Sequence, residues 1–127
     1  MKSVLLLGGA GFIGSNLSET FINHPYNVTV YDKEDGNFEN LKTIWNNINV
    51  IKGDLNDAIK IENIFIENNV DFVIHLADSF ISSTEHDTFI KDLKKNLFNT
   101  INIIDIMQKH NVKKLIYFSS LYVMGIS

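Results

Sequence analysis

The sequence of 127 residues lacks cysteine and arginine and contains a single proline. Without cysteine the chain has no disulfide, no thiolate metal site and no cysteine nucleophile, which is compatible with a cytoplasmic location. Without arginine it has no bidentate guanidinium for a phosphate or a guanine edge, and together with the net charge of −4 this argues against nucleic acid as a partner. No apolar run approaches the roughly 20 residues that span a bilayer, so no membrane association is expected. The four histidines do not cluster, and no metal-ligand spacing appears.

Apolar residues make up 45% of the chain, too many for a disordered protein, and the length suits one domain. Strands are expected at residues 4–7, 28–31, 49–52, 71–75 and 114–118. Between them lie helical repeats that start at Ile13, Ala58 and Phe89, a short helix at 38–46, and a loop or irregular helix at 77–87. This alternation predicts one α/β domain over residues 1–127: a doubly wound parallel sheet of about five strands in the order 3-2-1-4-5, with helices on both faces and ending after strand 5.

Three spaced glycines, Gly8, Gly11 and Gly14, follow the first expected strand and open the first expected helix. Glycine permits a tight turn at the first position, lets the backbone approach a pyrophosphate at the second, and allows close helix–strand packing at the third. The helix N-terminus adds free N–H groups and a positive dipole end. This pattern predicts a nucleotide phosphate site. The alternatives are a plain structural turn and a signal peptide, since residues 4–14 are largely apolar.

Asp32 stands at the end of the second expected strand, eighteen residues after Gly14. A carboxylate at this place can accept both hydroxyls of an adenosine ribose, and it would repel a 2′-phosphate. No arginine is present to hold such a phosphate, although Lys33 is adjacent. NAD is therefore favoured over NADP. The alternative is a solvated carboxylate in the charged stretch 32–35.

Polar residues also end the later strands. Asp54 follows the third strand and can bond an adenine amino group with Leu55 packed on the ring, but the residues alone favour a turn or helix-capping aspartate. His75 ends the fourth strand, where an isolated histidine is usually structural. Ser119 and Ser120 end the fifth strand, where a serine either bonds a substrate hydroxyl or carbonyl or is only a polar strand end.

Taken in order, these motifs resemble one family. They are the segment from Gly8 to Gly14, then Asp32, Gly53-Asp54-Leu55, His75-Leu76-Ala77, Asn96 and Phe118-Ser119-Ser120. Together they resemble the extended short-chain dehydrogenases/reductases and, more narrowly, the NAD-dependent epimerase/dehydratase group that acts on nucleotide sugars. The resemblance runs from Lys2 to Gly125 and implies a Rossmann-type fold.

The resemblance implies roles for individual residues along one cofactor. The residues expected to contact NAD are Gly8, Gly11, Phe12, Ile13 and Gly14 at the pyrophosphate, Asp32 and Lys33 at the adenosine ribose, Asp54 and Leu55 at the adenine, Leu76, Ala77 and Asp78 at the nicotinamide ribose, and Asn96 nearby. Ser120 matches the family's catalytic serine or threonine. A homodimer built through the long helix is a further expectation from the resemblance.

The chain departs from the family pattern at several places. Asp78 replaces a second alanine, Met124 replaces a tyrosine before the closing glycine, and Asn99 replaces a glycine three residues after the helix asparagine. The family's catalytic Tyr-x-x-x-Lys pair is also absent, because neither Tyr117 nor Tyr122 is followed by lysine four residues later. In that pair the lysine lowers the pKa of the tyrosine, which then works as acid and base.

Two hypotheses follow. The first is the N-terminal NAD-binding portion of a nucleotide-sugar epimerase/dehydratase-type oxidoreductase, without the substrate domain, whether the chain is a piece of a longer enzyme or a truncated product. The second is a non-catalytic dinucleotide-binding sensor or interaction module. For these 127 residues alone the expectation is weak or absent NAD binding and no turnover.

Overall fold

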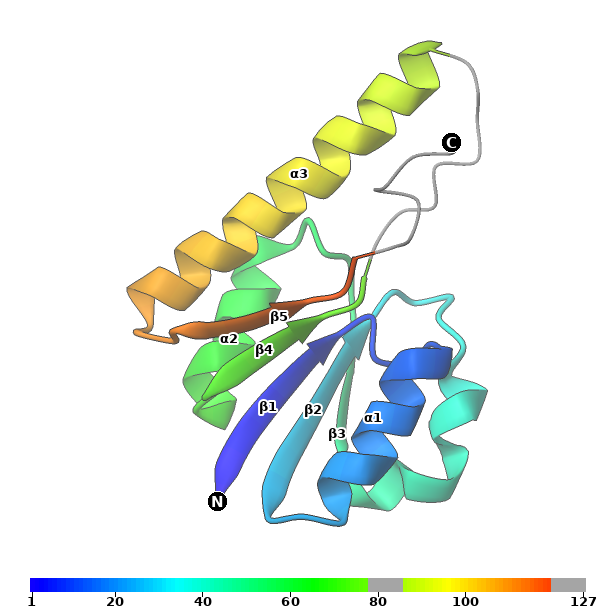
Figure 1. Ribbon diagram of the computed structural model, residues 1–127, viewed down its shortest axis with the longest axis vertical. Coiled ribbons are helices and arrows are strands. Elements are labelled where there is room, and N and C mark those ends of the chain that lie inside the picture. The colour runs from blue at the N-terminus through cyan, green and yellow to red at the C-terminus, as the bar shows by residue number, and fades with distance from the viewer. Residues whose placement is uncertain (78–85, 120–127) are drawn as a thin grey trace.

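The computed structural model of the protein describes residues 1–77 and 86–119. Within these ranges the strands are β1 (Lys2–Leu7), β2 (Tyr26–Asp32), β3 (Asn49–Lys52), β4 (Phe72–His75) and β5 (Lys114–Tyr117) (Figure 1). The helices are α1 (Phe12–Ile22), the 3₁₀ helix η1 (Phe38–Asn47), α2 (Ala58–Asn68) and α3 (His86–Lys109). Strands and helices thus alternate along the chain as the sequence predicts.

The strands form one parallel sheet in the order β3-β2-β1-β4-β5. Because all strands run in the same direction, their carboxyl ends meet at one border of the sheet, which we call the carboxyl edge. There Leu7 of β1 pairs with Tyr31 of β2 and with His75 of β4. The predicted strand order is confirmed. The chain adds β2 and β3 on one side of β1 and then crosses to the other side for β4 and β5. In such sheets ligands bind at this switch point between β1 and β4.

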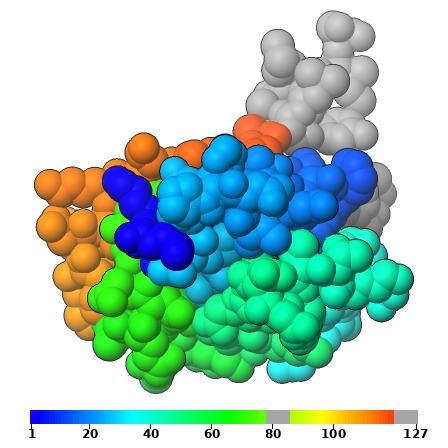
Figure 2. Space-filling view, turned by 90° about the horizontal axis from the view of Figure 1, so that it is seen from below, coloured from blue at the N-terminus to red at the C-terminus, as the bar shows by residue number. Residues whose placement is uncertain are grey.

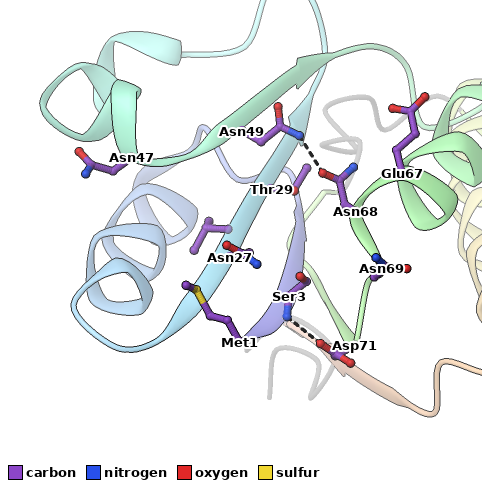
Figure 3. Close-up of a pocket in the computed structure, with 11 residues that line it drawn as sticks. Met1, Ser3, Asn27, Thr29, Asn47, Asn49, Glu67, Asn68, Asn69 and Asp71 are labelled. Atoms are coloured by element: carbon purple, nitrogen blue, oxygen red, sulfur yellow. Dashed lines mark hydrogen bonds between the residues drawn. The ribbon is translucent and has the colours of Figure 1, made fainter.

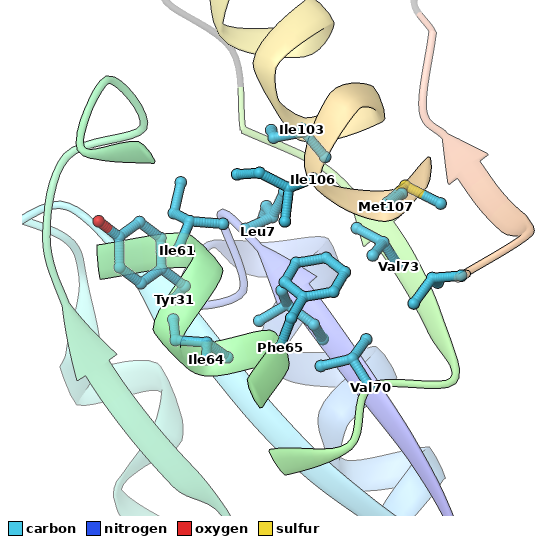
Figure 4. Close-up of a cluster of buried hydrophobic side chains, with 12 residues drawn as sticks. Leu7, Tyr31, Ile61, Ile64, Phe65, Val70, Val73, Ile103, Ile106 and Met107 are labelled. Atoms are coloured by element: carbon cyan, nitrogen blue, oxygen red, sulfur yellow. The ribbon is translucent and has the colours of Figure 1, made fainter. Parts of the chain in front are cut away.

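Helices cover both faces of the sheet, as predicted (Figure 1). Successive residues of a strand point to opposite faces, so Leu5 and Leu7 pack on one side of β1 and Val4 and Leu6 on the other. The first side is covered by α2 and α3, whose buried residues include Phe65 and meet the strand residues in Figure 4. The second side is covered by α1 and η1. Each fully buried aliphatic side chain contributes roughly 1.5–3 kcal/mol relative to exposure, so these two cores hold the sheet edge in place.

Local sequence explains several helix boundaries. Helix α2 is capped by Asp57, whose Oδ1 accepts the N–H of Lys60 at 3.1 Å. The same helix ends at Asn69, which has a left-handed φ of 48°. Helix η1 buries Leu41 and Ile44, and this spacing of three residues lies on one face of a 3₁₀ helix.

The prediction of a loop or irregular helix at 77–87 is wrong at its end. Helix α3 begins at His86, three residues before the apolar repeat at Phe89. Its first turn is polar, so apolar periodicity alone gave no sign of it, and Asp87 there suits a helix N-terminus. Residues 78–85 lie outside the described part of the chain.

The N-terminus lies at the end of the sheet opposite the carboxyl edge. Figure 2, seen from below, shows the first residues in dark blue beside α1, with the end of α3 in orange. Among the described residues, no helix combines the length and the hydropathy that a membrane span requires.

Candidate functional site

A cleft of about 710 Å³ lies at the carboxyl edge. Its lining brings together residues from loops that follow the first four strands and from α3. Those that the sequence singles out as cofactor contacts are Gly8, Gly11, Asp32, Lys33, Asp54, Leu55, Leu76 and Ala77. Residues separated by up to 69 positions along the chain therefore form one surface, which the strand order places at the switch point of the sheet.

The three glycines occupy different environments. Gly8 has a φ of +77°, and a Cβ added there would lie 2.7 Å from the backbone nitrogen of Ala77. A Cβ on Gly14 would lie 2.5 Å from the Cα of Gly9, so this position is closed by the packing of α1 on the loop. At Gly11 the nearest atom to an added Cβ is the carbonyl oxygen of Gly8, at an ordinary 3.7 Å. The protein itself thus requires glycine at two of the positions, whereas a Cβ at Gly11 would make only an ordinary contact.

Helix α1 presents an uncapped N-terminus to this cleft. Gly11 is its N-cap residue, no side chain caps the helix, and the first turn holds no acidic residue. The side chains of Phe12 and Ile13 are exposed, 81% and 49% respectively, so an anion would meet their backbone N–H groups and not their side chains. The positive end of the helix dipole therefore remains available to a phosphate.

Asp32 ties the end of β2 to the glycine loop. Its Oδ2 accepts the N–H of Ala10 at 3.0 Å, and its Oδ1 accepts the N–H of Lys33 at 2.8 Å. Each carboxylate oxygen has a second lone pair, so Asp32 can still accept a ribose hydroxyl. The ammonium of Lys33 lies 4.0 Å from the carboxylate of Asp35 in an exposed pair.

Tyr31 fixes the turn that carries Asp54 and Leu55. The Tyr31 hydroxyl donates to the backbone carbonyl of Asp54 at 2.6 Å. Burial, with the nearby carboxylates of Asp57 and Asp54, raises the pKa of Tyr31 to about 12. A Cβ on Gly53 would collide with the same hydroxyl, which explains the glycine before Asp54. The Asp54 carboxylate accepts the N–H of Asn56 at 3.3 Å, so it is a turn aspartate that also lines the cleft.

Several predicted residues are not part of the lining. Phe12, Ile13 and Gly14 belong to the first turn of α1 behind the loop, and Asn96 is half-buried on α3. Asp78 and Ser120 lie outside the described residues.

The lining also contains residues that the sequence reading missed. They are Tyr31, Asp35, Gly36, Asn37 and Lys95. Gly53 and Asn99 also line the cleft; the sequence analysis names them as part of a motif and as a departure from the family pattern, but not as lining residues. The position of Tyr31 beside Asp32 at a strand end was a usable signal, whereas nothing local marks Lys95, which reaches the cleft through the docking of α3.

His75 lies beneath the edge and not in the cleft lining. It is 2% exposed, its Nε2 is 3.3 Å from Oγ1 of Thr100, and its ring meets that of Tyr117 edge-on at 5.1 Å. Its Nδ1 has no hydrogen-bond partner within the described residues. Burial lowers the pKa of His75, which keeps the ring neutral. In residues 1–77 and 86–119 no group of three His, Cys, Asp or Glu side chains could hold a metal ion.

A second cavity of about 610 Å³ lies at the amino ends of the strands (Figure 3). Its polar groups bond to one another: the N–H of Ser3 donates to Asp71 at 2.7 Å, and the amide of Asn49 donates to Asn68 at 3.1 Å. This cavity borders neither the glycine loop before α1 nor the switch point of the sheet. The cleft at the carboxyl edge is therefore the candidate site.

Comparison with known proteins identifies the family of the chain. The model of the NAD dependent epimerase/dehydratase family matches residues 4–127. The bifunctional UDP-glucose 4-epimerase and UDP-xylose 4-epimerase 1 of Pisum sativum is 30% identical over 98% of this chain and 38% of its own length. The dTDP-D-glucose 4,6-dehydratase of Dictyostelium discoideum is 33% identical over 98% of this chain and 30% of its own.

Solved structures share the fold of the chain. The UDP-glucose 4-epimerase of Bifidobacterium longum, determined in complex with NAD+ and UDP, superimposes with a TM-score of 0.86 at 32% identity, covering 98% of this chain and 38% of that one. The chain belongs to the NAD dependent epimerase/dehydratase family and has its Rossmann-type fold. It spans about 38% of the length of that epimerase and of the Pisum relative.

Proposed function

We propose that residues 1–127 form the N-terminal NAD-binding portion of a nucleotide-sugar epimerase/dehydratase-type oxidoreductase. The observation that carries this proposal is the cleft in which the glycine loop, Asp32 and the end of β4 come together. Relatives over nearly the whole chain are UDP-sugar epimerases and a dTDP-sugar dehydratase, which supports a nucleotide sugar as the substrate of the full-length protein.

The residues present fit a dinucleotide. The absence of a side chain at Gly11 and the uncapped start of α1 suit a pyrophosphate, which would accept hydrogen bonds from backbone N–H groups without displacing a side chain. Asp32 has acceptor capacity left for the adenosine ribose, and Leu55 offers an apolar surface for the adenine. We infer NAD and not NADP, because a 2′-phosphate beside Asp32 would meet a negative charge with no arginine to offset it.

When bound, NAD supplies hydride transfer from and to a sugar carbon. The described residues would bind and orient it: the glycine loop at the pyrophosphate, Asp32 at one ribose, and Leu76 and Ala77 at the other. Ser120 is proposed to polarise the sugar hydroxyl. The sequence holds no Tyr-x-x-x-Lys pair, so the proposal places the acid/base residues outside these 127 residues.

Calorimetric titration of the full-length protein with NAD and with NADP tests this proposal. We expect NAD to bind more tightly than NADP, and Asp32→Asn to weaken NAD binding while keeping an oxygen for the N–H of Ala10. Glu34→Gln is the matched control, because Glu34 is exposed in the same loop and does not line the cleft. Equal binding of NAD by the unchanged protein and Asp32→Asn, or no binding of either cofactor, would contradict the proposal.

A further inference from the structure

The backbone of Ala10, inside the glycine loop, is held by two side chains. Its N–H donates to Oδ2 of Asp32 at 3.0 Å, and its carbonyl oxygen accepts a hydrogen bond from Nδ2 of Asn40 at 3.0 Å. A carbonyl oxygen can only accept, so the amide NH₂ of Asn40 is the group that faces it. Asp32 ends β2 and Asn40 belongs to η1, so two separate elements hold one residue of the loop.

Asn40 is well placed to hold the loop because its own backbone is anchored. The next residue, Leu41, is fully buried, and Ile44 one turn later is 6% exposed. Both lie in the same hydrophobic core as Ala10, which is also fully buried. Helix η1 can therefore move away from the glycine loop only if this core opens, and the short side chain of Asn40 joins two docked segments.

The loop between β1 and α1 consists of residues 8–11, and three of these four residues are glycines. Glycine loses more conformational freedom on ordering than any other residue. Within the loop, the N–H of Gly11 meets the carbonyl oxygen of Gly8 at a long 3.4 Å. Ala10 is the one residue of the loop with a side chain, and it leads through Gly11 into the uncapped start of α1. Holding Ala10 therefore orders the loop before an anion binds, which lowers the entropic cost of binding.

We propose that Asn40 is a positioning residue for the pyrophosphate. It holds the glycine loop in the conformation that presents the N-terminal N–H groups of α1 to a phosphate, and it does not itself line the cleft. This inference rests on the proposed binding of NAD. It assigns a role in binding to η1, a helix that contributes no residue to the motifs of the sequence.

Calorimetric titration of the full-length protein with NAD, ADP and adenosine tests this role. Asn40→Ala is expected to weaken NAD and ADP about fivefold, the size of the net contribution of one hydrogen bond, because the loop must then be ordered on binding. Adenosine carries no phosphate, so its affinity should not change. The control is Asn46→Ala, which removes an exposed asparagine from the same helix outside the cleft lining.

Asn40→Leu separates the lost hydrogen bond from a change in side-chain size. Leucine is similar in size to asparagine and cannot donate, so the same fivefold loss is expected, with Asn46→Leu as the control. If either Asn40 variant weakens adenosine as much as ADP, Asn40 supports the whole site and not its phosphate end, and the proposal is wrong. It is equally wrong if both Asn40 variants unfold in thermal melts while their controls stay folded.

The outcomes also separate this inference from the proposed function. If the unchanged protein binds NAD, Asp32→Asn weakens it, and neither Asn40 variant differs from its Asn46 control, this inference is wrong and the proposed function stands. If the unchanged protein binds no NAD, the proposed function fails and this inference fails with it.

Discussion

The hydrogen bond from Tyr31 to the carbonyl of Asp54 provides a sharp test of how the cleft is built. It joins the end of β2 to the turn after β3 at 2.6 Å, and the ring of Tyr31 is 1% exposed. Tyr31→Phe keeps the ring and removes only the hydroxyl. A buried hydrogen bond of this kind contributes about 1–1.5 kcal/mol, so the free energy of unfolding should fall by about that amount at pH 7.

The pH dependence of this loss follows from the pKa of Tyr31. The folded-state value of about 12 lies above the ordinary value of 10.0, so the folded state favours the protonated hydroxyl. Its contribution is fully present below pH 10 and is lost as the pH rises towards 12. The difference in stability between the unchanged protein and Tyr31→Phe should therefore shrink over that range.

Urea denaturation at several pH values measures this difference. Tyr26→Phe is the matched control, because Tyr26 packs among aromatic rings on the other face of the sheet and should change stability by less than about 0.5 kcal/mol. The reasoning is refuted if Tyr31→Phe is as stable as the control at pH 7, or if its deficit persists undiminished above pH 11.

Three further predictions concern other parts of the molecule. Gly8→Ala should lower the free energy of unfolding by about 2 kcal/mol, because Gly8 has a left-handed φ and an added Cβ would lie against the backbone after β4. Gly11→Ala should leave the free energy of unfolding unchanged and weaken NAD binding. Thermal melts measure the first effect and calorimetry measures the second. Burial lowers the pKa of His75, so the neutral ring is favoured in the folded state. Its contribution to stability is present above the unfolded pKa of about 6.5 and is lost as the pH falls. Denaturation curves should show a smaller loss of stability at low pH for His75→Gln, which does not titrate. These 127 residues should self-associate, because the edge strand β5 leaves Ile116 and Tyr117 43% and 49% exposed. Light scattering should show less self-association for Ile116→Lys. A monomer at every concentration would contradict this prediction.

The parts of the fold that depend on local sequence could be predicted. The parallel sheet followed from the alternation of β-rich and helical segments, and its strand order is the one typical of doubly wound folds. Both ends of α2 agree with residue type, since aspartate favours an N-cap and asparagine tolerates the left-handed φ of Asn69. The start of α3 at His86 did not, because its first turn has no apolar periodicity and its position depends on tertiary packing.

Several lining residues of the candidate site, among them Asp32, Asp54 and Leu76, could be predicted because they end or follow strands and the sheet itself carries strand ends to one edge. Lys95 and Asn99 could not be found in this way, since their place in the cleft depends on how a helix of 24 residues docks on the sheet. The same holds for the carbonyl of Asp54, a backbone group that residue identity does not reveal.

The structure distinguishes three glycines that the sequence pattern treats alike. In the sequence, Gly8, Gly11 and Gly14 are three positions of one spaced motif. In the structure the chain itself closes the space around Gly8 and Gly14, while a Cβ on Gly11 would meet nothing closer than 3.7 Å. The packing of the chain therefore does not account for glycine at position 11, which lies at the start of an uncapped helix and in the lining of the cleft. Under the proposed function a bound pyrophosphate accounts for it, and the weaker NAD binding expected of Gly11→Ala tests this proposal.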